Sequence, residues 1–228
     1  MDFVADAKVA GLLLQGVPEL WPGSTVVCIG GGPSLTRRQV DFCNGRARVI
    51  AINDAYRLAP WADVLYAADS KWWRWHEGVP GFQGMKFGLR WMAKEKRFND
   101  GWEGEKYLDV QGVAGTGDLG LEMDRRGVRT GGNGGYQAIN LAVHLGARRI
   151  ILLGYDMRTV DGKSHWFGEH PDGVPTHYRS TRVWFQALIR PLEDLEVEVI
   201  NCTPGSVLMA FPMEVLEDVL YREEMAPA

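Results

Sequence analysis

The stretch that decides the fold is residues 26–34, which read VVCIGGGPS. An apolar run stops at three glycines, and a proline and a serine follow. This pattern predicts a buried parallel strand, a tight turn and the start of a helix near Pro33 and Ser34. Glycine lets the backbone approach a ligand closely, and a helix start offers free N–H groups with partial positive charge. The stretch therefore predicts either a turn that binds a phosphate or another anion, or a plain strand-to-helix turn without a ligand.

The turn matches neither of two well-known phosphate-binding motifs. The dinucleotide motif G-x-G-x-x-G needs a glycine at the position where this chain has Leu35. The P-loop motif ends in Gly-Lys-Ser/Thr, whereas this turn ends in Gly32-Pro33-Ser34. The sequence therefore disfavours both an NAD-dependent oxidoreductase and a P-loop ATPase.

The composition is typical of a globular protein. The 228 residues suffice for one large α/β domain, or for one domain with an insert. Hydrophobic residues make up 46% of the chain and charged residues 24%, which are ordinary proportions. The formal net charge of −4 argues against a dominant nucleic-acid-binding face, although it is compatible with a local basic patch.

The cysteines and the apolar segments predict where the protein works. Cys28, Cys43 and Cys202 are interpreted as thiols in a reducing compartment, and their spacing matches no metal-binding motif. No apolar stretch approaches the roughly 20 residues that span a bilayer. The first residues lack the basic region of a signal peptide. We therefore expect a cytoplasmic protein without a membrane span.

Expected strands and helices alternate along the chain. Strands are expected at residues 25–29, 48–52, 63–68, 149–154 and 197–201, and helices at 5–15, 34–43, 136–145, 184–192 and 213–222. This alternation predicts an α/β fold with a doubly wound, mostly parallel, Rossmann-like sheet and helices on both faces. Residues 1–228 are expected to form a single domain, with residues 71–132 as an insert or lid over the substrate.

Two polar pairs directly follow expected strands. They are Asn53-Asp54 and Asp69-Ser70. Ligands of open α/β sheets bind outside the carboxyl ends of the strands, so these side chains would share a rim with the glycine turn. Asn, Asp and Ser are also good helix caps. Capping and ligand contact are therefore both open for each of them.

The segment Lys71–Trp75, which reads KWWRW, mixes basic and aromatic residues. Aromatic side chains in such a patch can stack on bases or sugars, or they can simply pack at helical spacing. Nucleic acid is disfavoured as a partner by the acidic net charge. Exposed tryptophans between residues 71 and 102 would be consistent with a contact between subunits of a homo-oligomer.

A second glycine-rich turn lies at residues 131–135, directly before an expected helix, and it is a second candidate anion site. A later loop, which runs to about residue 180, carries His165, His170 and His177. Histidine transfers protons near neutral pH, and we expect at most one of the three to be catalytic. Their spacing matches no helix-borne metal site.

Several blocks of the chain together resemble a bacterial sialyltransferase family. Residues 30–35 resemble its G-x-G-P-S-L turn, and Asn53-Asp54 matches the pair that ends its second strand. Residues 133–156 resemble its glycine turn, helix and following strand. His177-Tyr178 matches its His-Tyr pair, and residues 202–208 resemble its segment from cysteine to leucine. The order and the approximate spacing of the blocks agree over most of the chain.

The same core is similar to archaeal 6-hydroxymethylpterin pyrophosphokinases and to flagellin-modifying motility accessory proteins. We also associate close variants with phage and bacterial proteins. The resemblance therefore supports a fold more firmly than a reaction, because one fold hosts many activities.

The resemblance implies a nucleotide-dependent transferase, foremost a sialyltransferase-like glycosyltransferase. Such an enzyme moves a sugar from a nucleotide donor, for example a CMP-sugar, to the hydroxyl of an acceptor that the sequence does not identify. His177 would be the general base that deprotonates the acceptor hydroxyl, and His165 and His170 are secondary candidates in the same loop. No tightly bound cofactor is expected.

The resemblance also implies a set of ligand contacts. Two departures weaken them: the family's Thr-Ser-Gly turn reads Asn133-Gly134-Gly135 here, and its phosphate-holding tyrosines have no sure match, so that Tyr178 or His165 would stand in. The resemblance places Asn53, Asn133, Gly134 and Gly135 at the nucleotide and donor, and Gly31 and Gly32 at the phosphate or ribose. With the glycine turns and strand ends added, the expected nucleotide- and donor-binding residues are Gly30, Gly31, Gly32, Ser34, Asn53, Asp54, Asp69, Ser70, Asn133, Gly134, Gly135, Gly154, Asp156 and Tyr178.

Two other functions are open at this point. The first is an ATP-dependent pyrophosphokinase or phosphotransferase, in which Asp54, Asp69 and Asp156 would hold Mg²⁺, since carboxylates suit this ion. The second is a protein that binds a nucleotide or a sugar without catalysis. Metal dependence of nucleotide binding distinguishes the first function from metal-free glycosyl transfer.

Overall fold

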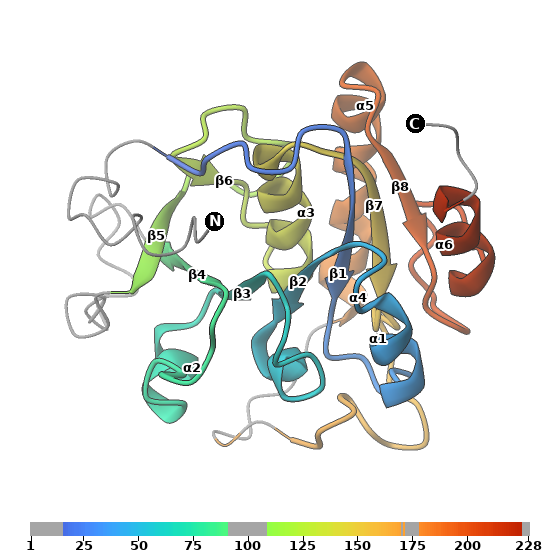
Figure 1. Ribbon diagram of the computed structural model, residues 1–228, viewed down its shortest axis with the longest axis horizontal. Coiled ribbons are helices and arrows are strands. Elements are labelled where there is room, and N and C mark those ends of the chain that lie inside the picture. The colour runs from blue at the N-terminus through green and yellow to red at the C-terminus, as the bar shows by residue number, and fades with distance from the viewer. Residues whose placement is uncertain (1–15, 91–108, 170, 172–177, 225–228) are drawn as a thin grey trace.

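The computed structural model describes residues 16–90, 109–169, 171 and 178–224. They form an open sheet of eight parallel strands in the order β6-β5-β4-β3-β2-β1-β7-β8. The strands are β1 (Ser24–Ile29), β2 (Arg48–Ile52), β3 (Val64–Ala67), β4 (Met85–Arg90), β5 (Val110–Gly115), β6 (Gly127–Val128), β7 (Ala147–Leu153) and β8 (Glu198–Asn201). The expected α/β, Rossmann-like architecture is confirmed, and Figure 1 shows the sheet with its helices.

Helices cover both faces of the sheet. They are the α-helices α1 (Arg37–Cys43), α2 (Ser70–Trp75), α3 (Gly134–Leu145), α4 (Tyr178–Thr181), α5 (Gln186–Asp194) and α6 (Leu216–Glu224), with the 3-10 helices η3 (Asn53–Arg57) and η6 (Arg182–Phe185). Alternate strand residues point to opposite faces. Val26 and Cys28 of β1 pack with α3 and α5, whereas Val27 and Ile29 pack with α1, α2 and α6. Burial on both faces explains why the expected strands read as continuous apolar runs.

The glycine turn after β1 does not lead directly into a helix. Helix α1 begins at Arg37, whereas the sequence predicted a start near Pro33 and Ser34. Thr36 caps the helix, because its hydroxyl accepts the N–H of Gln39 and the Gln39 side chain accepts the N–H of Thr36. This capping box satisfies two amides at once and sets the start of the helix. The predicted helix N-terminus at the first glycine turn is therefore wrong.

The region expected as an insert or lid contributes to the sheet. Its described part holds most of α2 and strands β4, β5 and β6, which extend the sheet beyond β3. Strand β4 escaped prediction because Lys86 occupies a buried position in it, where its ammonium donates to Gly78 O at 2.9 Å and to Asp109 Oδ2 at 2.6 Å. Whether any part of residues 71–132 covers a substrate stays a prediction.

The remaining elements agree with expectation where the structure describes them. Helix α3 ends at the C-cap Gly146, whose φ of 102° lies in the left-handed region that glycine tolerates. The expected helix at residues 5–15 lies outside the described residues. Across the described ranges, the structure contains no helix with the length and apolar character that a bilayer crossing requires.

Candidate functional site

A cavity of about 220 Å³ opens at the carboxyl edge of the sheet. It lies where the chain order reverses: β1 is followed by β2 on one side, whereas its neighbour on the other side is β7. Such a switch point is where open α/β sheets bind ligands. Fifteen residues line the cavity, namely Gly31, Gly32, Ile52, Asn53, Gly132, Asn133, Gly134, Gly135, Gly154, Tyr155, Asp156, Met157, His165, Phe167 and Tyr178.

The N-terminus of α3 forms one wall of this cavity. Asn133 caps the helix, and its Oδ1 accepts the N–H groups of Gly135 at 2.7 Å and of Tyr136 at 3.4 Å. Gly131 and Gly132 directly precede the helix, and their φ angles of 51° and 56° are ones that residues other than glycine rarely adopt. The first amides of a helix lack partners within it and carry partial positive charge. Because Asn133 Oδ1 already accepts two of these amides, this wall offers an anionic group the helix dipole and the N–H of Gly134.

The glycine turn after β1 forms the opposite wall and is tied to the end of β7. Gly30 N–H donates to Leu153 O at 2.7 Å, and Gly32 N–H donates to Gly154 O at 2.8 Å. A Cβ at Gly32 would lie only 1.9 Å from Asp156 Oδ2, and one at Gly30 would lie 2.7 Å from Gly154 O. Two of the three glycines are thus required by contacts within the protein.

Gly31 differs from its two neighbours. A Cβ there would meet only the rings of Phe167 at 3.2 Å and His165 at 3.3 Å, and both of these residues line the cavity. The two rings stack with centroids 4.9 Å apart. Trp166 N–H donates to Gly31 O at 3.1 Å, which holds the loop after β7 over the turn. Figure 1 shows this loop running below the carboxyl ends of the strands.

Asp156 lies at the junction of the two turns. Its side chain is buried, and Oδ1 accepts the N–H of Ser34 at 3.2 Å. Among the described residues, neither its Oδ2 nor the Ser34 hydroxyl has a hydrogen-bond partner. Burial raises the pKa of Asp156 above its ordinary value, and Ser34 partly offsets that rise. The carboxyl group thus couples the β1 turn to the end of β7.

The Asn53-Asp54 pair is divided between two environments. Asn53 lines the cavity in a left-handed conformation, with φ of 50°. Asp54 is absent from the lining; its Oδ2 accepts the indole N–H of Trp72 at 2.9 Å, and Arg57 Nη1 lies 3.4 Å from its Oδ1. The structure therefore does not bring Asp54 to the cavity.

Asp69 and Ser70 also lie away from the cavity lining. Asp69 caps α2 by accepting the N–H of Lys71 at 2.7 Å, as the capping alternative predicted. In α2, Trp72 and Trp73 are almost completely buried, whereas Trp75 is partly exposed. Packing, rather than base stacking, therefore accounts for two of the three tryptophans in KWWRW.

Some predicted residues fall where the structure gives no answer. His170 and His177 lie outside the described residues, so the general base stays a prediction. In residues 16–90, 109–169, 171 and 178–224, no three His, Cys, Asp or Glu side chains are grouped to hold a metal ion. Asp54, Asp69 and Asp156 are therefore not arranged as a shared magnesium site.

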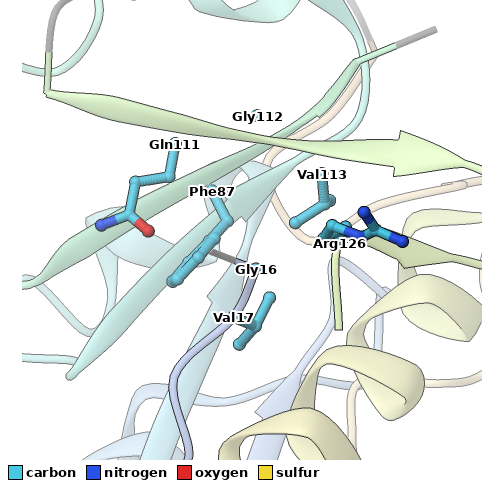
Figure 2. Close-up of a pocket in the computed structure, with 7 residues that line it drawn as sticks. All are labelled: Gly16, Val17, Phe87, Gln111, Gly112, Val113 and Arg126. Carbon is cyan, nitrogen blue, oxygen red and sulfur yellow. The ribbon is translucent and has the colours of Figure 1, made fainter. Parts of the chain in front are cut away.

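A second, smaller cavity lies between β4, β5 and the segment before β1, and Figure 2 shows it. Its volume of about 30 Å³ has room for about two water molecules. The residues that line it are Gly16, Val17, Phe87, Gln111, Gly112, Val113 and Arg126. This cavity is too small for a nucleotide or a sugar.

Sequence reasoning missed several residues of the larger cavity. Ile52, Tyr155, Met157 and Phe167 line it, although none carries a chemistry that a motif search would select. Tyr155 donates its hydroxyl to Gly135 O at 3.0 Å and so joins β7 to α3. The sequence did carry one signal for Tyr155: it directly follows Gly154, the last residue of an expected strand, and ligands bind beyond strand ends.

Comparison with known proteins bears on the fold. The chain matches no protein-family model and no curated protein sequence. Its structure is similar to that of a MAf glycosyltransferase from Magnetospirillum magneticum AMB-1, with a TM-score of 0.57 and 18% sequence identity. The match covers 92% of this chain and 38% of that one, so the chain spans well under half of the other protein's length. At this identity the similarity shows a shared fold.

Proposed function

We propose that the protein is a nucleotide-dependent transferase that moves a sugar from a nucleotide donor to an acceptor hydroxyl. The observation that carries this proposal is the cavity at the switch point, where the N-terminus of α3 faces the glycine turn of β1. Similarity to the fold of a glycosyltransferase supports the same class of reaction. A sialyltransferase-like reaction with a CMP-sugar is the specific form that the sequence resemblance favours.

In this proposal, the phosphate of the donor lies at the first turn of α3. The lining contains no lysine or arginine among the described residues, so the helix dipole and the backbone N–H groups that Asn133 does not occupy, foremost that of Gly134, would carry the anion. Asn53 and Tyr178 would contact the nucleotide or the sugar from two other sides of the cavity. The aromatic rings of His165 and Phe167 would cover the ligand.

The first experiment is a thermal-shift screen with CMP, UMP, GMP, AMP and ATP, each with and without Mg²⁺. A ligand that binds only the folded protein raises the melting temperature Tm. We expect a metal-independent rise with at least one nucleoside monophosphate. A rise that needs both ATP and Mg²⁺ would instead support the phosphotransferase, and no rise with any nucleotide would contradict the proposal.

The second experiment tests the base. His177→Ala should abolish sugar transfer and leave the Tm rise with nucleotide intact, because the base acts on the acceptor hydroxyl and not on nucleotide binding. Full activity of His177→Ala combined with loss in His170→Ala would move the base to the other histidine. Nucleotide binding without hydrolysis or transfer to any acceptor would support a non-catalytic binding protein.

A further inference from the structure

We infer that Asp54 is a positioning residue, which anchors the β2–η3 turn to α2 and thereby holds Asn53 in the shape that faces the cavity. The two neighbours point to different environments. Asn53 lines the cavity, whereas Asp54 is 5% exposed and makes its contacts with α2 and η3. This inference rests on the proposed function only in taking Asn53 as a ligand contact.

The backbone of Asn53 needs an external restraint. Its φ of 50° places it in the left-handed region, which asparagine enters more readily than most residues but at a cost relative to glycine. Such a conformation persists where the surrounding structure enforces it. At this residue the chain turns sharply from β2 into η3. As a result, Asn53 lines the cavity, whereas the side chain of Asp54 contacts α2.

Asp54 supplies that restraint through three neighbours. Trp72 Nε1, which is buried in α2, donates to Asp54 Oδ2 at 2.9 Å. Arg57 Nη1 lies 3.4 Å and His76 Nε2 3.7 Å from Asp54 Oδ1. His76 is itself fixed, since its Nδ1 lies 3.1 Å from the hydroxyl of Tyr56 and its ring packs 4.3 Å from the Trp72 ring. The carboxylate therefore joins the turn to the aromatic cluster of Tyr56, Trp72 and His76.

The chain offers a closely matched pair of variants. Trp72 and Trp73 are adjacent in α2 and each is 2% exposed, but the indole N–H of Trp73 donates to Ala67 O at 3.0 Å instead of to Asp54. Trp72→Phe and Trp73→Phe each remove one buried N–H and keep an aromatic ring. Both should lower Tm, since each removes the hydrogen bond of a buried indole.

Nucleotide affinity separates the two variants. The probe is the nucleoside monophosphate that raises Tm most in the screen. We expect Trp72→Phe to weaken its binding about tenfold, because the turn that carries Asn53 loosens. Trp73→Phe should change binding less than about twofold. Equal weakening by both variants would overturn the inference, because Trp72 would then act only through general stability.

The Asp54 side chain provides the conservative rescue. Asp54→Asn keeps an oxygen that accepts the Trp72 N–H but loses the oxygen that Arg57 Nη1 and His76 Nε2 approach, so binding should weaken less than it does in Asp54→Ala. Asp54→Ala removes the acceptor and should weaken binding as Trp72→Phe does. A loss in Asp54→Asn as large as in Asp54→Ala would overturn the inference, because the hydrogen bond to Trp72 would then not be what positions Asn53.

A ligand-free measurement keeps this inference separate from the proposed function. Glycine adopts positive φ without strain. In an Asn53→Gly background, the hydrogen bond between Trp72 and Asp54 is therefore no longer needed to hold residue 53 at positive φ. Trp72→Phe should then lower Tm less than it does with Asn53 present, whereas Trp73→Phe should lower Tm equally in both backgrounds. Equal effects of Trp72→Phe in the two backgrounds would overturn the anchor. Failure of every nucleotide to bind would contradict the proposed function. The comparison of Tm between the two backgrounds would still test the inference, because it needs no ligand.

Discussion

The glycine turn after β1 and the glycine turn before α3 border the same cavity, but their glycines have different neighbours. At Gly32 an added Cβ would collide with Asp156 and with the backbone of Gly154. At Gly134 an added Cβ would meet only Ile52 Cγ2, at 3.3 Å. Gly32 is therefore required by the joint between β1 and β7, whereas Gly134 lies at a helix N-terminus where an added side chain would meet little of the protein. Each run contains both kinds of glycine, since Gly31 of the first run meets only rings that line the cavity, and Gly131 and Gly135 of the second run pack against tyrosine rings.

The largest expected effect tests this contrast directly. Gly32→Ala should destabilise the protein by about 3 kcal/mol, because its Cβ would lie 1.9 Å from Asp156 Oδ2 and 2.5 Å from Gly154 O. Gly134→Ala should change the free energy of unfolding by less than about 1 kcal/mol, since alanine favours the helix and the contact is mild. It should nevertheless weaken nucleotide binding. Urea unfolding and nucleotide titration of both variants check this, and equal stability losses would remove the contrast.

The cap of α3 gives the next largest effect and separates stability from binding. Asn133→Ala should cost about 1 kcal/mol of stability, because the N–H groups of Gly135 and Tyr136 lose their acceptor. Asn133→Asp should keep the cap but repel an anionic ligand, so stability is retained and nucleotide affinity falls.

Thr36→Ala is the matched control for the cap. It removes the cap of α1, at the helix that follows the other glycine turn. It should cost a similar stability, about 1 kcal/mol, and leave nucleotide affinity unchanged. If Asn133→Asp bound the nucleotide as well as the unmodified protein does, the phosphate would not lie at α3.

The smallest effect concerns the Asp156 joint and depends on pH. Burial raises the folded-state pKa of Asp156 above 3.8, so the folded protein holds this proton more tightly than the unfolded chain does. The cost of burying the charge is then fully present above the folded-state pKa and is relieved as the pH falls toward 3.8. Asp156→Asn keeps an acceptor for Ser34 N–H without the charge. It should raise Tm by a few degrees at pH 7, with a difference that shrinks toward pH 4; a difference that grows toward pH 4 would contradict this account.

Much of the sheet could be predicted from the sequence, because β1, β2, β3 and β7 are apolar runs that are buried on both faces. Strands β4 and β5 could not, since Lys86 is buried at a position that a pattern expects to be apolar, and Gly112 interrupts β5. The rule that ligands bind beyond the strand ends predicted a common location for Gly31, Asn53, Asn133 and Asp156, and all four line one cavity, while their contact with a ligand stays a prediction. It failed for Asp54, because a left-handed residue at the end of β2 turns two successive side chains to different environments.

The start of α1 shows a second limit of sequence reasoning. Pro33 and Ser34 are both good residues for a helix start, yet the pair Thr36 and Gln39 forms a reciprocal cap three residues later. Two acceptable starts compete there, and the one that satisfies more amides wins. A pattern alone does not rank such competitors, since the ranking depends on hydrogen bonds that form only in the folded chain.

The central claim is that an anionic ligand lies at the first turn of α3, between the two glycine turns. The most direct measurement is a ¹⁵N–¹H correlation NMR titration with the nucleoside monophosphate that stabilises the protein most. The account predicts saturable shifts of the Gly134 and Gly135 amide signals, with smaller shifts for Gly30, which lies outside the cavity lining. Saturable shifts confined to residues away from the cavity, with the α3 amides unchanged, would contradict it.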